Sequence, residues 1–311
     1  MYATAALRIA EELRPRYMLE PGADDPDLQA EREMFKRLFY FLGVTATKFQ
    51  FLQDHGALYI MEPSWIHKMM GPPKPLPGEE GLAARAVYCF AFMIELGNNQ
   101  VTEDFTDMQY LYAKLSDKLS IESCSRVETS LIRWYNDLPA SYRVTPNIFQ
   151  YVPPEELARA DPYTLNLATC FYACWLILHA HFLPPLEPDG SDALAAESKA
   201  AKLSLRSLTI CVKSANIVTA IAEHMSARWR CRFEPHNLLH ACDVHLRLSR
   251  SKDIRLAAMG RRNLRRSIEI FKANIWGSSG KVPGKGAHVS RYYTSLAGSL
   301  ETSLAKFGIP F

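Results

Sequence analysis

Two histidines and an aspartate follow one another at helical spacing in the C-terminal half of the chain. His236, His240 and Asp243 occupy positions i, i+4 and i+7, and histidines four residues apart on a helix can bind one zinc ion. Asp243 is a poor third ligand, because seven residues correspond to about 10 Å of helical rise. Asn237 stands where a zinc protease has its glutamate base. We therefore expect a structural pair of His240 and Asp243 beside a core, and no metal site.

The cysteines suggest neither a metal site nor a disulfide framework. Cys170 and Cys174 are four residues apart and His181 follows seven residues later, which is an equally incomplete ligand set. Cysteines in an apolar helix usually belong to a core. The 7 cysteines are odd in number and irregularly spaced. This pattern predicts reduced, mostly buried thiols and an intracellular protein.

An acidic cluster near the N-terminus is the pattern that best suggests catalysis. Asp24, Asp25 and Asp27 are similar to the aspartate-rich motif with which all-α terpene cyclases hold magnesium and pyrophosphate. A second magnesium motif begins at residues 136–138 but fails, because Pro139 interrupts the helix. The acidic cluster also suits the start of a helix, where carboxylates are favoured. We expect no enzyme, with a magnesium-dependent prenyl diphosphate enzyme as the alternative.

A basic cluster occupies a later predicted helix, at Arg261, Arg262, Arg265 and Arg266. Such a cluster can contact nucleic acid or act as a nuclear import signal. No interleaved aromatic residues accompany it, and arginines on the outer face of an amphipathic helix are usually solvated. We expect no direct contact with nucleic acid. The glycine-rich residues 277–286 lack the spacing of a phosphate loop and predict an ordinary loop.

The 19 prolines divide the chain into long proline-free windows of helical character, because proline breaks the interior of a helix. The windows are residues 27–62, 78–138, 163–183, 189–234, 236–282 and 284–309. None shows the sustained period-two alternation that indicates strands. The sequence therefore predicts an all-α fold, as a single large multi-helix domain over residues 1–311 with about nine to eleven helices.

Helix starts, buried faces and loops can be placed within these windows. Aspartate–proline pairs at positions 25–26 and 161–162 each predict a cap followed by the first helical residue. Residues 199–226 predict a surface helix with one buried stripe, and residues 264–275 repeat that pattern with arginines outside it. Residues 165–183 are apolar nearly all round and predict a central helix. Predicted loops are residues 71–81, 184–191 and 277–290.

Composition limits the class of protein. With 311 residues, 48% of them hydrophobic, the chain can bury a large core and is neither a disordered tail, a collagen nor a disulfide-stapled miniprotein. A net charge of +3 does not indicate a nucleic-acid binder by bulk charge. Glu11 and Glu12 interrupt the apolar run that a signal peptide needs. The one membrane candidate, residues 165–183, contains Asn166 and two histidines, so we interpret it as a core helix.

Several stretches, in order along the chain, resemble the fungal-specific transcription factor regulatory domain, the middle homology region of zinc-cluster transcription factors. They are residues 2–10, 32–40, 131–139, 165–183, 208–226 and 271–276. Residues 37–40, Arg-Leu-Phe-Tyr, are similar to that family's R-L-F-W, and residues 134–139 are similar to its W-x-x-x-L-P. The chain departs from the family at Ala46 and Thr47, where the family has D-R.

The family's N-terminal zinc cluster has no counterpart here, because no two cysteines of this chain have C-x-x-C spacing. The family region also begins some helices before the point matched by Tyr2, so we expect those N-terminal helices to be missing. The resemblance implies a nuclear protein, with zinc only in that absent cluster and no cofactor in this chain.

The resemblance further implies a regulatory, effector-sensing domain of a fungal transcription regulator. Its partners would be a small-molecule effector, a transcription co-regulator or a second copy of the chain, with no membrane involved. Candidate effector-binding residues are Asn166, His179, His181, His240 and Asp243. The first four are polar groups expected on central helices, where each needs a hydrogen-bond partner. That partner could be a ligand or, more commonly, a neighbouring helix. A stand-alone protein-interaction module is a further alternative.

Overall fold

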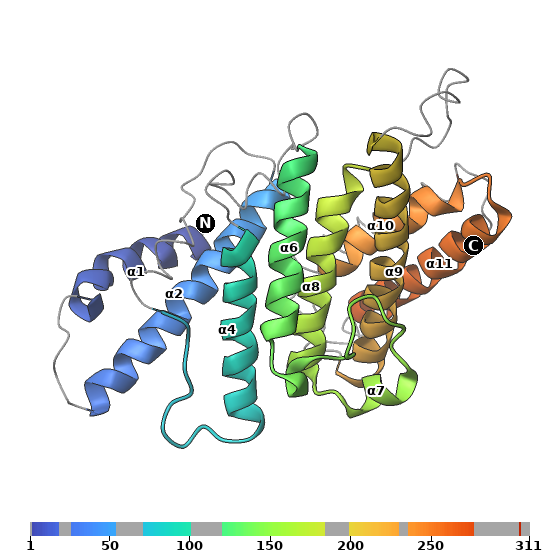
Figure 1. The fold of residues 1–311 in the computed structure, drawn as a ribbon. Coiled ribbons are helices and arrows are strands. Elements are labelled where there is room, and N and C mark those ends of the chain that lie inside the picture. Colours follow the sequence, from blue (N-terminus) through green and yellow to red (C-terminus); the bar gives the residue numbers. More distant parts are fainter. Residues whose placement is uncertain are drawn as a thin grey trace. The chain divides into compact units, whose positions relative to one another are not determined.

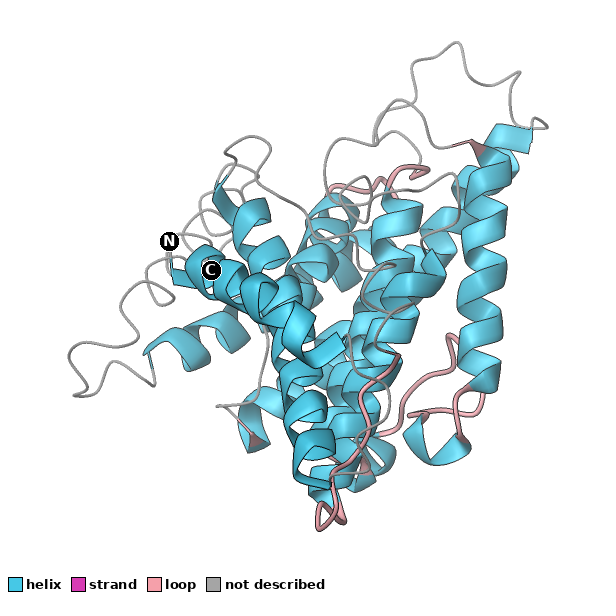
Figure 2. Ribbon diagram, turned by 90° about the vertical axis from the view of Figure 1, so that its left-hand side faces the viewer, coloured by secondary structure: helices cyan, strands magenta, loops and turns pink. Residues whose placement is uncertain are grey.

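The computed structural model describes residues 2–18, 26–53, 71–100, 120–183, 199–229, 236–276 and 305. They belong to two compact units, Met1–Leu138 and Pro139–Phe311, and each unit is described by itself. The described residues form nine α-helices and one 3-10 helix and no strand. Figure 1 labels the α-helices, and Figure 2 colours the helices and loops. The predicted all-α class with nine to eleven helices is confirmed. One domain over residues 1–311 stays a prediction.

Four helices make up the described part of the first unit. They are α1 (Tyr2–Met18), α2 (Pro26–Gln53), α4 (Leu82–Gln100) and α6 (Ile121–Asp137). Helix α1 packs along α2, and α4 packs against α6. Buried side chains from α1, α2 and α4 form a common core of Ala10, Phe35, Phe39, Tyr40 and Ile94. Aromatic contacts contribute to this core, since Tyr17 stacks on Phe35 with ring centroids 4.6 Å apart.

The predicted loop at residues 71–81 is confirmed, and it is fixed to α2 by an ion pair. The Arg37 guanidinium donates to Glu79 Oε1 at 2.8 Å and to Glu79 Oε2 at 2.7 Å. Glu79 Oε2 also accepts from the backbone N–H of Leu76 at 2.6 Å. Gly78 has a φ of 84°, a conformation that glycine adopts without steric cost. The turn can therefore bring the Glu79 carboxylate back to α2.

Five α-helices and one 3-10 helix make up the described part of the second unit. They are η2 (Ala140–Tyr142), α7 (Pro154–Arg159), α8 (Pro162–Ala180), α9 (Lys199–Arg228), α10 (His236–Ser249) and α11 (Ile254–Trp276). Helix α9 contacts α8, α10 and α11, and α10 contacts both α8 and α11. Figure 1 shows α8, α9, α10 and α11 side by side, in agreement with these contacts. The long helices thus share one core.

Helix α8 is the central helix that the sequence predicts. Its cap is Asp161, whose Oδ1 accepts from the backbone N–H groups of Tyr163 at 2.9 Å and Thr164 at 3.0 Å, as expected for an aspartate N-cap. The side chains of Phe171, Tyr172 and Trp175 on α8 are each 1% exposed. The other predicted cap, at residue 25, lies outside the described residues, although α2 begins at Pro26.

The prediction of a single buried stripe is too narrow for α9. The stripe residues Cys211 and Val218 are fully buried as predicted. Outside the stripe, Ser207, Thr219 and Ile221 are also fully buried. The hydrophobic pattern misses this because small hydroxyl side chains can be buried when a neighbouring helix supplies a hydrogen bond. Helix α9 is therefore buried over a wider face than one stripe, while Lys202, Arg206, Lys213 and Glu223 on its other face are exposed as predicted.

The predicted stripe of α11 is confirmed where its side chains are described. Leu264, Ile268 and Phe271 are at most 1% exposed. Arg261 and Arg265 lie on the exposed side of the same helix. The side chain of Ile275 lies outside the described residues. Helix α11 is thus amphipathic: its apolar face packs against the second unit, and its arginines face outward.

One described helix segment, Ala201–Arg228 of α9, is long and apolar enough to cross a membrane by length and composition. The structure buries 56% of its most apolar window. A segment that is buried against three neighbouring helices occupies the position of a core helix. The segment differs from the sequence-based candidate at residues 165–183.

Candidate functional site

The buried candidate His179 has a partner on a neighbouring helix. Its Nδ1 lies 2.9 Å from the Ser207 hydroxyl, so the pair joins α8 to α9. The imidazole also stacks on Trp175, with ring centroids 5.6 Å apart and planes 9° apart. The sequence left two possible partners for His179, a ligand or a neighbouring helix, and in the structure the partner lies on the neighbouring helix α9.

None of the other four candidates is fully buried as His179 is. Asn166 is half-buried on α8, 13 residues before His179, which corresponds to about 20 Å along the helix. His181 was expected to be buried, and this is wrong: it is exposed where α8 ends. His240 is half-buried on α10, and Asp243 is exposed on the same helix. Asn166 and His179 therefore lie in different parts of α8.

His245 is a buried histidine that the candidate set left out. Its Nε2 lies 2.8 Å from the Thr219 hydroxyl, and the residue is fully buried between α9 and α10. Burial is the main cause that lowers its pKa to about 3. The imidazole is therefore neutral near neutral pH and acts as a structural hydrogen-bond partner.

Asp27 is the member of the acidic motif that the structure describes. Asp24 and Asp25 lie outside the described residues, and Asp27 is exposed in the first turn of α2. Asn136 and Asp137 are exposed at the end of α6. The described part of the motif is consistent with acids at a helix start.

The described cysteines are reduced. Cys89, Cys124, Cys211 and Cys242 are buried, and Cys170 and Cys174 are half-buried on α8. Burial is the main cause that raises the pKa of both Cys211 and Cys242 to about 12. Such thiols remain protonated and poorly nucleophilic. Reduced and mostly buried thiols are thus confirmed for the described cysteines.

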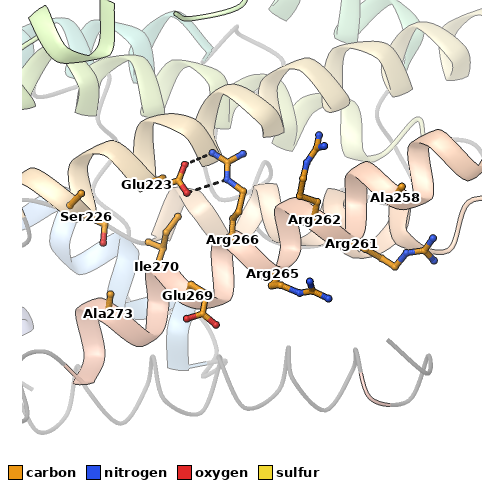
Figure 3. Close-up of a pocket in the computed structure, with 11 residues that line it drawn as sticks. Glu223, Ser226, Ala258, Arg261, Arg262, Arg265, Arg266, Glu269, Ile270 and Ala273 are labelled. Carbon is orange, nitrogen blue, oxygen red and sulfur yellow. Dashed lines mark hydrogen bonds and ion pairs between the residues drawn. The ribbon is translucent and has the colours of Figure 1, made fainter. Parts of the chain in front are cut away.

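A groove lies along the surface between α9 and α11, with a volume of about 810 Å³ (Figure 3). Its described lining consists of Glu223, Ser226, Ala227, Ala258, Arg261, Arg262, Arg265, Arg266, Glu269, Ile270 and Ala273. The volume falls within the range of roughly 300–1,000 Å³ that is usual for ligand sites. This groove is the candidate functional site.

The arginine cluster forms one wall of the groove, and Arg266 is paired across it with Glu223. Arg266 donates to Glu223 Oε1 through Nε at 3.3 Å and to Glu223 Oε2 through Nη2. Figure 3 shows Arg266 turned toward Glu223, while Arg261 and Arg262 extend away from that pair. Arg261, Arg262 and Arg265 are exposed. The groove therefore offers guanidinium groups beside apolar surface.

A chain of hydrogen bonds leads from the groove into the α9–α11 contact. Arg266 Nη1 donates to Asn263 Oδ1 at 3.1 Å. Asn263 Nδ2 donates to Asn216 Oδ1 at 2.6 Å, and Asn263 is only 3% exposed. Glu223, Arg266, Asn263 and Asn216 thus form one network that spans from the rim of the groove to the buried face of α9. A group that binds Arg266 would act on this network.

A smaller cavity of about 210 Å³ lies in the first unit, between α4 and α6. Glu95 and Phe92 line it from α4, and Arg133 and Trp134 line it from α6. Burial raises the pKa of Glu95. The cavity is smaller than the usual ligand site, so the α9–α11 groove remains the stronger candidate.

Sequence inspection found the arginines but not the groove. The spacing of the arginines marks one face of α11. In the sequence, this basic cluster suggested a contact with nucleic acid or a nuclear import signal. Glu223 is 43 residues from Arg266, and no local pattern connects them. Comparisons of the chain with family models, curated proteins and solved structures find no match.

Proposed function

We propose that this chain is a regulatory, effector-sensing domain of a transcription regulator of the fungal-specific type, and that it binds a ligand or a partner without catalysing a reaction. The domain would act in the nucleus, and DNA binding would reside outside the described helices. Its sensing surface would be the α9–α11 groove. The candidate residues inferred from sequence would serve mainly as helix-to-helix contacts, as His179 does with Ser207.

The observation that carries this proposal is the connection between the groove and the buried α9–α11 contact. Arg266 bonds to Glu223 at the rim and to Asn263 inside. Because both bonds use the same guanidinium, a ligand that competes for Arg266 would change the contact between the two helices. Binding and a change in helix packing would thus be coupled, as a regulatory domain requires.

The positions of the family-like stretches support the same proposal. Residues 32–40 lie within α2, residues 165–183 include most of α8, and residues 208–226 lie within α9. Residues 131–139 include the end of α6, where Trp134 and Leu138 are buried. Each stretch that the resemblance relates to a helix therefore falls on a helix.

A tethered reporter assay tests the regulatory role. The full chain is fused to a heterologous DNA-binding domain in a fungal cell, and transcription of a reporter is compared with that driven by the DNA-binding domain alone. We expect reporter transcription to change, and we expect R261E/R262E/R265E to remove the change. Arg255, exposed on α11 outside the groove lining, provides the control R255E. An unchanged reporter with a well-expressed fusion contradicts the proposal.

The enzyme alternative has its own test. The purified chain is incubated with Mg²⁺ and prenyl diphosphates, and pyrophosphate release is measured. We expect no release above that of a heat-denatured sample. Release that is lost in D24N/D25N would replace the regulatory proposal with the cyclase-like one.

A further inference from the structure

Two cysteines lie on a narrow face of α8 that reaches solvent. Over residues 164–179, the positions of α8 that are not buried are Asn166, Cys170 and Cys174. Their spacing of four residues places them one above another along the helix. The other described cysteines are buried. Cys170 and Cys174 are therefore the described thiols that are open to a solute.

Helix α10 supplies a hydrogen-bond donor to this pair of thiols. Asn237 Nδ2 donates to Cys170 Sγ at 3.4 Å, and the Asn237 side chain is held in place because the residue is only 8% exposed. A charged sulfur accepts a stronger hydrogen bond than a neutral one, so this contact favours the thiolate over the thiol. The thiolate is the form of cysteine that binds a metal ion.

The spacing of the two thiols is too wide for a disulfide and suits a bridging ion. The Cβ atoms of helical residues four apart are separated by about 5–6 Å, whereas a disulfide needs Cβ atoms about 3.5–4.5 Å apart. A disulfide here would therefore distort α8. Two metal–sulfur bonds of about 2.3 Å each, in a straight line, span about 4.6 Å between the sulfurs. One ion can thus join the two thiolates without a change in the helix.

The number of ligands selects the kind of ion. Within the described part of the chain, the two thiols belong to no group of three histidine, cysteine or carboxylate ligands. A structural zinc ion takes four ligands in tetrahedral geometry, so this pair does not complete a zinc site. Soft thiolate ligands favour Cu(I), and a monovalent d10 ion of this kind is stable between two ligands in a line.

We propose that Cys170 and Cys174 form a two-coordinate binding site for a soft monovalent cation, Cu(I) being the member of this class that we would test. On binding, each thiol releases its proton to solvent and forms one Cu–S bond, and the copper stays in the +1 state. The complex carries one negative charge, which the Asn237 amide faces. None of these residues lines the α9–α11 groove, so the inference goes beyond the proposed regulatory function.

A titration of the full chain with Cu(I) tests this site. The reduced chain is titrated without oxygen, in competition with a coloured Cu(I) chelator. We expect each chain to hold one Cu(I), and X-ray absorption of the copper to show two sulfur neighbours and no nitrogen. Cys170→Ser and Cys174→Ser should each weaken Cu(I) binding by about tenfold or more, because a hard oxygen replaces one of two soft ligands.

Two other thiols provide the controls. Cys211→Ser changes a buried thiol on α9, and Cys231→Ser changes a thiol outside the described residues; both variants should keep the wild-type affinity. Circular dichroism of each variant checks that its helices remain. If Cys170→Ser and Cys174→Ser retain the copper, or if Cys231→Ser loses it, the proposal is wrong. A third sulfur or a nitrogen in the wild-type X-ray absorption spectrum also overturns it, and this measurement needs no variant.

The contribution of α10 has a test of its own. Asn237→Leu keeps a side chain of similar volume but donates no hydrogen bond, so we expect Cu(I) binding to weaken by about two- to tenfold. An unchanged affinity would show that Asn237 does not favour the thiolate.

The spacing argument can be tested without a metal. Oxidised glutathione should form mixed disulfides with Cys170 and Cys174, each releasing one glutathione, and peptide mass spectrometry should find no bond between the two cysteines. A Cys170–Cys174 disulfide in a chain that keeps its helices overturns the spacing on which the site depends. Zn²⁺ that displaces Cu(I) at a lower concentration overturns the two-coordinate assignment. None of these outcomes changes the result of the reporter assay, so the two proposals can fail separately.

Discussion

At the scale of single residues, His245 contributes to the response of the second unit to acid. Its imidazole has a pKa of about 3 in the folded chain, against an ordinary value of 6.5. The unfolded chain therefore binds more protons between these two pH values, so stability falls as the pH decreases through that range. One proton contributes at most about 1.4 kcal/mol per pH unit to this slope.

His245→Gln tests this effect. Glutamine keeps a polar group near the Thr219 hydroxyl but does not titrate, so we expect a smaller loss of stability between about pH 6.5 and pH 4 in urea unfolding. Thr219→Val serves as the control, because it removes the 2.8 Å hydrogen bond and leaves the imidazole buried. It should lower stability by about 1 kcal/mol and keep the slope. An unchanged slope in His245→Gln would show that another group titrates.

At the scale of helices, the contact between α10 and α11 depends on the absence of a side chain at Gly260. A Cβ atom there would lie 2.6 Å from the backbone N of Ser249, 2.8 Å from the backbone O of His245 and 2.8 Å from the Leu248 Cβ. Two of these atoms belong to the backbone of α10, which cannot rotate away. The two helices would have to separate to admit even a methyl group.

Gly260→Ala tests this contact, because helix propensity and overpacking predict changes in stability of opposite sign. In an exposed helix the substitution would stabilise by about 1 kcal/mol through helix propensity. Here we expect destabilisation by about 1–3 kcal/mol, from overpacking, measured as a lower Tm. The neighbouring substitution Arg261→Ala, at an exposed position, should change stability by about 0.5 kcal/mol or less. A higher Tm for Gly260→Ala would mean that propensity outweighs the close approach.

At the scale of the whole molecule, each unit holds a group that lowers stability in acid, His245 in the second unit and Glu79 in the first. In the first unit, the hydrogen bond from Arg37 is the largest of the interactions that lower the pKa of Glu79 to about 2, from an ordinary value of 4.5. The stabilisation is complete above the ordinary value and is lost as the pH falls toward 2. The His245 effect acts over a higher pH range than the Glu79 effect. Desolvation raises the pKa of Asp243 to about 6, and this acts in the opposite direction, so it partly offsets the loss of stability that His245 causes in acid.

Glu79→Gln separates the contribution of the first unit. We expect it to lower the free energy of unfolding by about 1 kcal/mol at neutral pH and to reduce the further loss between about pH 5 and pH 3. Glu80→Gln is the matched control, because Glu80 is exposed beside it in the same loop, and it should leave both quantities unchanged. If Glu79→Gln behaves like Glu80→Gln, the loop is fixed to α2 by other contacts.

Local sequence patterns were sufficient to predict the helices and some of the residues that the helices bury. The cap at Asp161 and the stripe of Leu264, Ile268 and Phe271 are properties of residues within a few positions of one another, and the structure has them as predicted. The breadth of burial on α9 was not predictable in this way. Ser207 and Thr219 look polar in sequence, and their burial depends on the histidines that α8 and α10 bring to them.

The sequence alone determined an all-α chain, its central helix and an arginine-rich face, because helix formation and amphipathicity depend on spacings of three and four residues. Only the tertiary structure decided that this face borders a groove, since the wall opposite the arginines comes from α9. Glu223 and Asn216 lie 43 and 47 residues from the α11 side chains that they bond. No local rule connects residues so far apart, because packing between helices sets which of them meet.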